Sequence, residues 1–424
     1  MNHSLTNLAT YQIIIFCLLL IFIFNTFFNI IRQHAHKGAV FSLTLLLIAL
    51  LFSGVISWEE KYYFTYDEEL NAASAENIKL VDFKVNPNVY IISFDALIPK
   101  SIYKKHFQTN EPTDYHRVLD SNFNSFTNFF ADEIPTSKSL NSLLLFDKEH
   151  FLNMKTKFRY TAYNGITPSP LFEVFKHNGY ESTTLFQTGY FGKKKGPFVD
   201  NYLINDKTEG VCQFVPNTQV KHVFLGYCAA SQSRLFQNSL NPSHDNKDSI
   251  NFLLSTMDSL TQKNTPQILL AYLFVPEHTP HDYQTYDDDD FNAYKQSYIE
   301  KSTIAAKHLE KIINFINSKD PNSILYVFGD HGPYLTQSIE FNDDKKFVIQ
   351  DRFGVYGGIY PKDQCKNSLS SPYEGGYTTV LRGMYMIVRC LTDGEEVFKQ
   401  ESPLYLRKFG KTNRERSYET YLYE

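Results

Sequence analysis

Ionisable side chains follow three apolar runs of the chain, at the point where each run ends. The runs are 88–94, 267–275 and 323–328. The side chains that follow them are Asp95, His278, His281, Asp330 and His331. Carboxylate oxygens and imidazole nitrogens are ligands of zinc and manganese in proteins. Each residue alone also fits a turn or a solvated loop, but together they predict a divalent metal site.

A candidate nucleophile lies between the first and second runs, in residues 131–146 (ADEIPTSKSLNSLLLF). Thr136 or Ser137 precedes a helical stretch, so either hydroxyl fits an N-cap with no catalytic role. The same place favours an anion, because the first turn of a helix has free N–H groups and the positive end of the dipole. A hydroxyl that also binds a divalent cation loses its proton more easily and becomes a nucleophile.

The three runs predict buried parallel strands, because they are continuously apolar and rich in β-branched residues. Between and around them lie amphipathic helical patterns at 169–178, 249–262 and 298–318. This alternation predicts an α/β fold with a mainly parallel central sheet and helices on both faces. Ligands of such sheets bind outside the carboxyl ends of the strands, where the ionisable residues are expected to meet.

Two uncharged stretches near the beginning of the chain have the length of membrane spans. They cover 12–31 and 39–57 and predict a two-helix transmembrane hairpin; two buried core helices are the alternative. The loop between them, 32–37, is basic, whereas the segment after the second span is acidic and aromatic. The positive-inside rule therefore places the loop in the cytoplasm and both termini outside.

Composition excludes several other classes of protein. The net charge is −5 with 41 Lys+Arg, so nucleic-acid binding through a basic surface is not expected. Hydrophobic residues make up 43% of the chain, which excludes a mostly disordered protein.

Cys17 lies in the first predicted span, and the other four cysteines allow two disulfides in an oxidising compartment. The shortest closures pair Cys212 with Cys228 and Cys365 with Cys390.

The order of these features resembles the sulfatase and alkaline phosphatase superfamily, and within it the phosphoethanolamine transferases of lipid A and the lipoteichoic acid synthases. Their nucleophile is a threonine followed by two residues and a serine, as in Thr136-Ser-Lys-Ser139. Their metal is bound by an acidic residue of the first strand, which Asp95 matches, and by an Asp-His pair, which Asp330 and His331 match. A loop histidine touches the substrate phosphate, and Glu277-His278-Thr279-Pro280 is similar to that loop.

The hydropathy pattern and the resemblance together predict four parts of the chain, and the resemblance implies a reaction. The parts are a transmembrane hairpin (1–58), a juxtamembrane connector (59–86), a sulfatase-like catalytic domain (87–395) and a C-terminal tail (396–424). The implied reaction moves phosphoethanolamine or phosphoglycerol from a phospholipid donor onto a cell-envelope glycan or lipid through a phospho-threonine intermediate. The implied location is the bacterial inner membrane, with the catalytic domain in the periplasm.

The resemblance also implies a role for each site residue. Asp95, Thr136, Asp330 and His331 would hold zinc or manganese, and Thr136 would attack the phosphorus. His278 would contact phosphate or protonate the leaving alcohol, with His281 as a second substrate-binding candidate.

Several alternatives remain at the level of sequence. Ser137 or Ser139 could replace Thr136 as the nucleophile. Water could be the acceptor, which would make the protein a phosphodiesterase or phosphonate-ester hydrolase. Sulfate-ester hydrolysis is disfavoured, because none of the five cysteines lies in a Cys/Ser-x-Pro-x-Arg motif. A catalytically silent envelope-binding module is the third reading, since no histidine follows His331.

Overall fold

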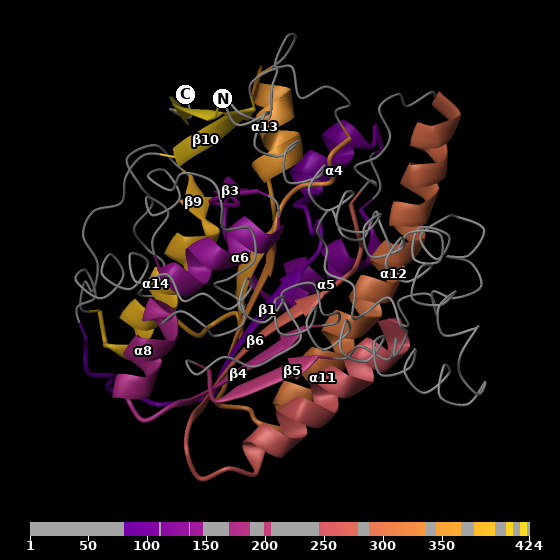
Figure 1. Ribbon diagram of the computed structural model, residues 1–424. Coiled ribbons are helices and arrows are strands. Elements are labelled where there is room, and N and C mark those ends of the chain that lie inside the picture. The colour runs from indigo at the N-terminus through magenta and orange to yellow at the C-terminus, as the bar shows by residue number, and fades with distance from the viewer. Residues whose placement is uncertain are drawn as a thin grey trace, which may run out of the picture. The chain divides into compact units, whose positions relative to one another are not determined.

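Seven strands form one sheet in the computed structural model of the protein (Figure 1). They are β1 (Val89–Phe94), β2 (Asn124–Ser125), β4 (Glu181–Phe186), β5 (Asn201–Ile204), β6 (Gln267–Leu273), β7 (Ile324–Gly329) and β8 (Gly357–Tyr360). Their order is β2-β8-β7-β1-β6-β4-β5. β1 pairs in parallel with β6 and β7, β4 pairs in parallel with β5 and β6, and β8 is antiparallel to its neighbours. The predicted mainly parallel sheet is confirmed.

The structure describes only part of the chain. The described residues are 80–109, 112–134, 136–146, 169–186, 199–204, 246–278, 288–335, 345–365, 377–394, 404–409 and 416–421. The predicted spans at 12–31 and 39–57 lie outside them, as do His281, Cys212 and Cys228. Among the helices of the described residues, none combines the length and the apolarity that crossing a bilayer requires.

β1 lies at the centre of the sheet and aligns the three predicted strands. Val89 is opposite Ile268 on one side and Ile324 on the other, and Phe94 at the far end is opposite Leu273 and Gly329. All three strands are buried along their length, as expected of apolar runs covered on both faces. Because their carboxyl ends share one register, the residues that follow them lie at one edge of the sheet.

Helices cover both faces of the sheet (Figure 1). One face carries α4 (Lys100–His106), α5 (Asp114–Asn122), α11 (Asn246–Thr261) and α12 (Asp288–Lys319). The other carries α6 (Thr136–Leu145), α8 (Pro170–His177) and α14 (Val380–Leu391). Alternate β1 residues divide between the two cores: Val89 and Ile91 face one, and Tyr90 and Ile92 face the other. This is the two-sided packing that the sequence predicts.

A third, smaller core lies beneath the helix α13 (Lys345–Phe353). Ile349 and Phe353 of this helix pack there with Phe130, Ile134 and Tyr334. Phe130 belongs to the short strand β3 (Phe129–Phe130), which pairs in parallel with β9 (Thr378–Thr379). These contacts join the segment before α6 to the segment after β7.

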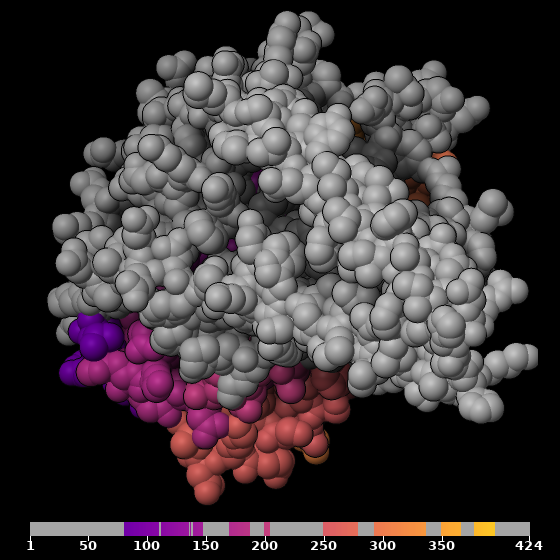
Figure 2. Space-filling model, viewed as in Figure 1, coloured from indigo at the N-terminus to yellow at the C-terminus, as the bar shows by residue number. Residues whose placement is uncertain are grey.

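The chain enters the described domain along a segment that packs against α8. Val81 and Phe83 belong to the core of the α8 face. The side chain of Asn178, at the end of α8, accepts a hydrogen bond from the N–H of Phe83 (2.7 Å) and donates one to the carbonyl of Val81 (2.8 Å). Figure 2 shows the indigo residues of this segment beside the magenta residues of α8. The last residues of the predicted connector, 80–86, are therefore part of the packed domain.

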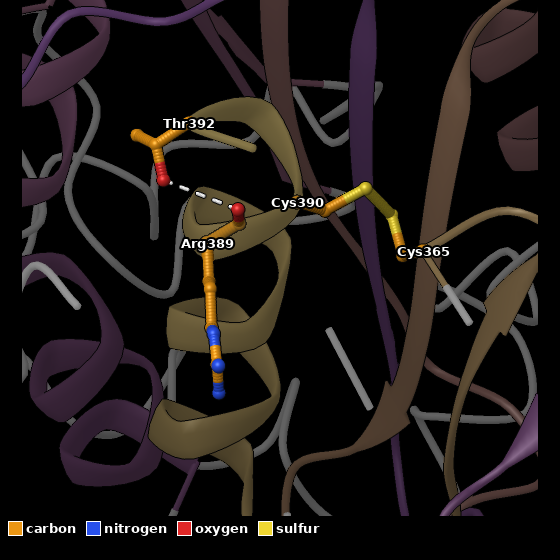
Figure 3. The surroundings of a disulfide bond; sticks show 4 residues. All are labelled: Cys365, Arg389, Cys390 and Thr392. Carbon is orange, nitrogen blue, oxygen red and sulfur yellow. Dashed lines mark hydrogen bonds between the residues drawn. A yellow bond between two sulfur atoms is a disulfide. The ribbon is translucent and has the colours of Figure 1, made fainter. Parts of the chain in front are cut away.

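A disulfide joins Cys365 to Cys390 near the end of α14 (Figure 3). This is one of the two shortest closures expected from the sequence. Beside it the N–H of Lys84 donates to the carbonyl of Leu391 (2.7 Å), which ties the entry segment to the same helix end. In the predicted tail, β10 (Leu404–Phe409) and β11 (Arg416–Tyr421) form an antiparallel pair.

Candidate active site

Three loops meet where β1, β6 and β7 end. Asp95 follows β1, Glu277 and His278 follow β6, and Asp330 and His331 follow β7. Backbone hydrogen bonds tie the loops together: the N–H of Asp95 donates to Leu273, that of Asp330 to Phe94, and that of Glu277 to the carbonyl of Asp95. The common register of the strands thus extends into the loops.

The side chains of these loops converge on one point. Nε2 of His331 lies 3.3 Å from Oδ2 of Asp330 and 3.8 Å from Oδ1 of Asp95. Nε2 of His278 lies 4.0 Å from Oδ2 of Asp95. Asp95, His278 and His331 each offer a ligand atom, and these atoms lie within 4.8 Å of one another. The structure therefore brings together four of the five residues that the sequence placed after three separate runs; the fifth, His281, lies outside the described residues.

Thr136 reaches this cluster from a fourth element. It is the first residue of α6 and is only 5% exposed. Its hydroxyl oxygen lies 3.0 Å from Nε2 of His331. Ser139 is also buried, one turn further along α6, while the side chain of Ser137 lies outside the described parts of the chain. Of the hydroxyls considered as nucleophiles, that of Thr136 has a direct contact with the cluster.

The ring of His331 is held in one orientation by its own loop. Its Nδ1 lies 2.9 Å from the carbonyl oxygen of Gly332. A carbonyl only accepts, so Nδ1 carries the proton, and Nε2 of the neutral ring is left with its lone pair. The hydroxyl of Thr136 therefore donates to Nε2. A histidine whose distal nitrogen is held by a carbonyl is the usual arrangement for a metal-binding imidazole.

Asp95 and Asp330 are fully buried acids in close proximity. Oδ1 of Asp330 accepts hydrogen bonds from the N–H groups of Ala96 (3.2 Å) and His331 (2.9 Å). Within the described residues, Oδ2 of Asp330 and both oxygens of Asp95 accept no hydrogen bond of normal geometry. Buried carboxylate oxygens without partners are strongly unfavourable.

Burial shifts the pKa of both acids upward. It raises the pKa of Asp330 to about 7, against the lowering effects of the nearby Thr136 hydroxyl and of backbone N–H groups. Burial and the charges of Asp330 and Glu277 raise the pKa of Asp95 well above its ordinary value, although the backbone N–H of His278 and the charge of Lys301 oppose this.

These residues fit a divalent cation. A cation at this point would meet three partnerless carboxylate oxygens, Nε2 of His331 and the hydroxyl of Thr136. Oxygen and nitrogen donors in this mixture suit zinc or manganese. The side chain of His278 differs from the others in being 19% exposed, whereas those of Asp95 and His331 are fully buried. Among Asp95, His278 and His331, His278 is therefore the one that a molecule in solution can approach.

Helix α12 supports two of the three loops. The hydroxyl of Tyr298 donates to the carbonyl of Ala96 (2.8 Å), in the turn after Asp95. The hydroxyl of Tyr294 donates to the carbonyl of Glu277 (3.2 Å), and Lys301 forms an ion pair with the Glu277 carboxylate. Sequence reasoning missed these residues. Their spacing of four and three places them on one helix face, but nothing local shows what that face contacts.

Helix α13 supports the third loop. The N–H of Gly332 donates to the carbonyl of Arg352 (2.9 Å), and the N–H of Leu335 donates to Oδ1 of Asp351 (2.8 Å). A Cβ at position 332 would lie 2.0 Å from the carbonyl oxygen of Asp351, so this close approach requires glycine. The sequence Asp-His-Gly predicts the tight turn, but it does not predict that the turn packs against α13.

Comparisons with known proteins agree with this architecture. Residues 89–373 match the model of the sulfatase family. This match covers more than half of the 424 residues. A search of curated proteins finds no match.

A search of solved structures also finds matches of low sequence identity. The C-terminal periplasmic domain of phosphoethanolamine transferase EptC from Campylobacter jejuni is 11% identical, with a TM-score of 0.43 over 72% of this chain and 89% of that chain. The corresponding EptC domain from Escherichia coli, in complex with Zn, is 10% identical, with a TM-score of 0.46 over 78% and 92%. The lipoteichoic acid synthase LtaP from Listeria monocytogenes is 13% identical, with a TM-score of 0.43 over 80% and 83%.

Proposed function

Because the chain belongs to the sulfatase family, we propose that it is a metal-dependent phosphotransferase that moves a phospholipid head group through a phospho-threonine intermediate. The observation that carries this proposal is the contact of 3.0 Å between the Thr136 hydroxyl and Nε2 of His331, beside two buried acids. Sulfatases make their nucleophile from Cys or Ser in a Cys/Ser-x-Pro-x-Arg motif, whereas Thr136 precedes Ser-Lys-Ser. A threonine in this position favours phosphoryl transfer over sulfate-ester hydrolysis.

Thr136 is suited to act as the nucleophile. In the metal-free structure its hydroxyl donates to the lone pair of His331 Nε2, so its oxygen lies beside the position that a cation bound by this lone pair would take. Thr136 also begins α6, whose first-turn N–H groups and positive dipole end stabilise an oxyanion and an approaching phosphate.

Asp95, Thr136, Asp330 and His331 would hold the metal ion, zinc or manganese. When bound, the ion would stabilise the ionised threonine oxygen and offset negative charge on the phosphate. The support for this assignment is the fit described above, in which three buried carboxylate oxygens lack a partner.

His278 is placed to act on the substrate. It lies at the cluster, with Nε2 4.0 Å from Asp95, and its side chain is 19% exposed, whereas those of Asp95 and His331 are fully buried. In the first step the ionised oxygen of Thr136, whose proton has already passed to solvent, forms a bond to phosphorus, the bond from phosphorus to the diacylglycerol oxygen breaks, and that oxygen takes a proton from protonated His278. In the second step an acceptor hydroxyl attacks phosphorus, its proton passes to His278, and the bond from phosphorus to Thr136 breaks, which returns the ionised Thr136 oxygen.

The donor is a phospholipid with a phosphoethanolamine or phosphoglycerol head group, and the acceptor is a glycan or lipid of the cell envelope. The two uncharged stretches at 12–31 and 39–57 would keep the site near its lipid donor. The disulfide between Cys365 and Cys390 supports an oxidising compartment for the domain. The basic loop between the stretches supports a position outside the cytoplasm, by the positive-inside rule. We propose the bacterial inner membrane, with the domain in the periplasm.

The proposal is tested by mass spectrometry of the full-length protein in detergent. The protein is incubated with Zn²⁺ and with vesicles of phosphatidylethanolamine and phosphatidylglycerol, without an acceptor. We expect a head-group mass on the peptide that contains Thr136, and none in the variant Thr136→Ala. The mass of the adduct identifies the donor.

Two further variants separate the alternatives. Thr136→Ser keeps a hydroxyl and should retain an adduct, whereas Ser139→Ala should form it as the natural protein does. An adduct that persists in Thr136→Ala would assign the nucleophile to Ser137 or Ser139. Rapid release of soluble phosphoethanolamine or phosphoglycerol would identify a hydrolase, and the absence of both adduct and lipid turnover would reject the enzyme.

A further inference from the structure

The aromatic ring of Tyr334 contacts both histidines of the site. Its centroid lies 4.6 Å from that of His331 and 5.4 Å from that of His278, whose own rings are 5.0 Å apart. The ring of Tyr334 meets that of His278 edge to face, at 84°. Tyr334 is 5% exposed, so it fills the space beside the two imidazoles from the protein side.

Tyr334 is itself held firmly in place. The guanidinium carbon of Arg352 lies 4.5 Å from the centroid of the Tyr334 ring, a cation–π distance. On either side of Tyr334, the N–H groups of Gly332 and Leu335 donate to Arg352 and Asp351 of α13. Tyr334 has a φ of 57°, in the left-handed region that is costly for a tyrosine. The surrounding hydrogen bonds hold it there despite that cost.

We propose that Tyr334 is a positioning residue that fixes the orientation of the His278 and His331 rings toward Asp95, and that Arg352 acts by holding Tyr334 in place. This inference rests on the proposed function only in that the cluster binds a divalent cation. A ligand ring that is already oriented loses less conformational freedom when the cation binds, so the affinity is higher. The residues around a metal ligand typically change metal affinity by about 10–100-fold.

The test measures Zn²⁺ affinity in the full-length protein in detergent, by competition with a chromogenic chelator. Tyr334→Leu removes the ring and should weaken Zn²⁺ binding by about tenfold or more. Tyr334→Phe keeps the ring and should bind Zn²⁺ within about threefold of the natural protein, because it keeps the ring contacts with His278 and His331. The visible absorption of the Co²⁺-substituted protein should change in Tyr334→Leu and remain unchanged in Tyr334→Phe.

Tyr180→Leu is the matched control. Tyr180 is another buried tyrosine, packed against Phe83 and Phe175 on the α8 face. The same exchange there should lower thermal stability while leaving Zn²⁺ affinity and the Co²⁺ spectrum unchanged. This comparison separates loss of positioning from loss of stability.

Arg352→Gln tests the second half of the proposal and does not depend on the folding of Tyr334→Leu. It should weaken Zn²⁺ binding by about fivefold, whereas Arg352→Lys, which keeps the charge, should restore part of the loss. In the Tyr334→Leu background, Arg352→Gln should cause no further loss, because Arg352 acts through the ring.

Three results would overturn the inference. Tyr334→Leu that binds Zn²⁺ with unchanged affinity and spectrum would show that the ring positions nothing. Unchanged affinity in Arg352→Gln would remove the role of Arg352, and additive losses in the double variant would show that Arg352 acts on the site independently. A natural protein that binds no Zn²⁺ would instead reject the proposed function, so the two failures are distinguishable.

Discussion

The carboxyl groups of Asp95 and Asp330 make the metal-free protein sensitive to pH. Both are fully buried, and burial raises the pKa of each above its ordinary value, that of Asp330 to about 7. Between the ordinary pKa of an aspartate and these raised values, the folded protein binds more protons than the unfolded chain. Stability of the metal-free protein therefore falls as pH rises through this range. A cation held by Asp95 and Asp330 would compensate the two charges and remove this loss.

Chelation should consequently destabilise the protein more in alkaline than in acidic solution. We expect EDTA to lower the Tm of the zinc-loaded protein by several degrees more at about pH 8 than at about pH 5, where protons take the place of the ion. Scanning calorimetry with and without EDTA at both pH values measures this. Asp330→Asn, which has no carboxyl to titrate at this position, should reduce the difference. Equal shifts at both pH values would contradict the assignment of the acids as ligands.

At the scale of elements, the site consists of loops that form hydrogen bonds to two helices, α12 and α13. α12 supports the turn after Asp95 and the loop before His278, and α13 supports the loop after His331. Pre-oriented groups of this kind are what a metal site or a catalytic site requires, because ordering them during the reaction would cost free energy.

The contact from α12 to the first loop predicts the effect of Tyr298→Phe. Loss of the hydroxyl leaves the buried carbonyl of Ala96 without this donor and should cost about 1–2 kcal/mol of stability. It should also weaken Zn²⁺ binding, because the turn carries Asp95. Tyr356→Phe is the control, since the Tyr356 hydroxyl bonds Ser125 instead. Urea unfolding and chelator competition on both variants check this; an equal loss of Zn²⁺ affinity in the two would contradict it.

The three central strands and the places where they end were predictable, because short runs that are continuously apolar and rich in β-branched residues favour buried parallel strands. The runs at 88–94, 267–275 and 323–328 correspond to β1, β6 and β7. The helix expected over 298–318 begins instead at Asp288. Acidic residues are favoured in the first turn by the helix dipole, which a search for an apolar stripe does not detect.

Other parts of the site depend on contacts between distant segments. Tyr334 follows the Asp-His-Gly turn directly, but its contact with Arg352 depends on where α13 packs, which no local pattern specifies. Likewise, Thr136 could be placed at a helix start from sequence, whereas its distance from His331 follows from packing across 195 residues of chain. The role of His281 stays a prediction, because it lies outside the described residues.

At the scale of the whole domain, the disulfide joins the segment after β8 to the end of α14. It closes a loop between residues 25 positions apart. In a chain-entropy model a loop of this length stabilises the fold by about 3–4 kcal/mol. We therefore expect the double variant Cys365→Ser, Cys390→Ser to lose roughly that amount in urea unfolding, with little change in Zn²⁺ affinity. A midpoint equal to that of the natural protein would show that this bond contributes little to stability.

The entry segment and the site lie at opposite ends of the central strand. The entry segment, packed on α8 and α14, leads into the beginning of β1, and the candidate metal ligands follow its end. Six strand residues separate these two edges, a distance of about 20 Å. If residues 39–57 cross the membrane as proposed, the connector is a tether attached to the edge of the sheet that lies away from the site.

A tether attached there would set the distance from the membrane over which the proposed enzyme can work. The residues from 59 to 79 could extend to at most ~70 Å, which exceeds the ~20 Å between the two edges of the sheet. The domain could therefore turn its site toward the bilayer to collect a lipid head group, and then turn away to deliver it to an acceptor that never approaches the membrane. Both halves of the proposed reaction would then be served by rotation about one attachment, without release of the domain from the surface that supplies the proposed donor.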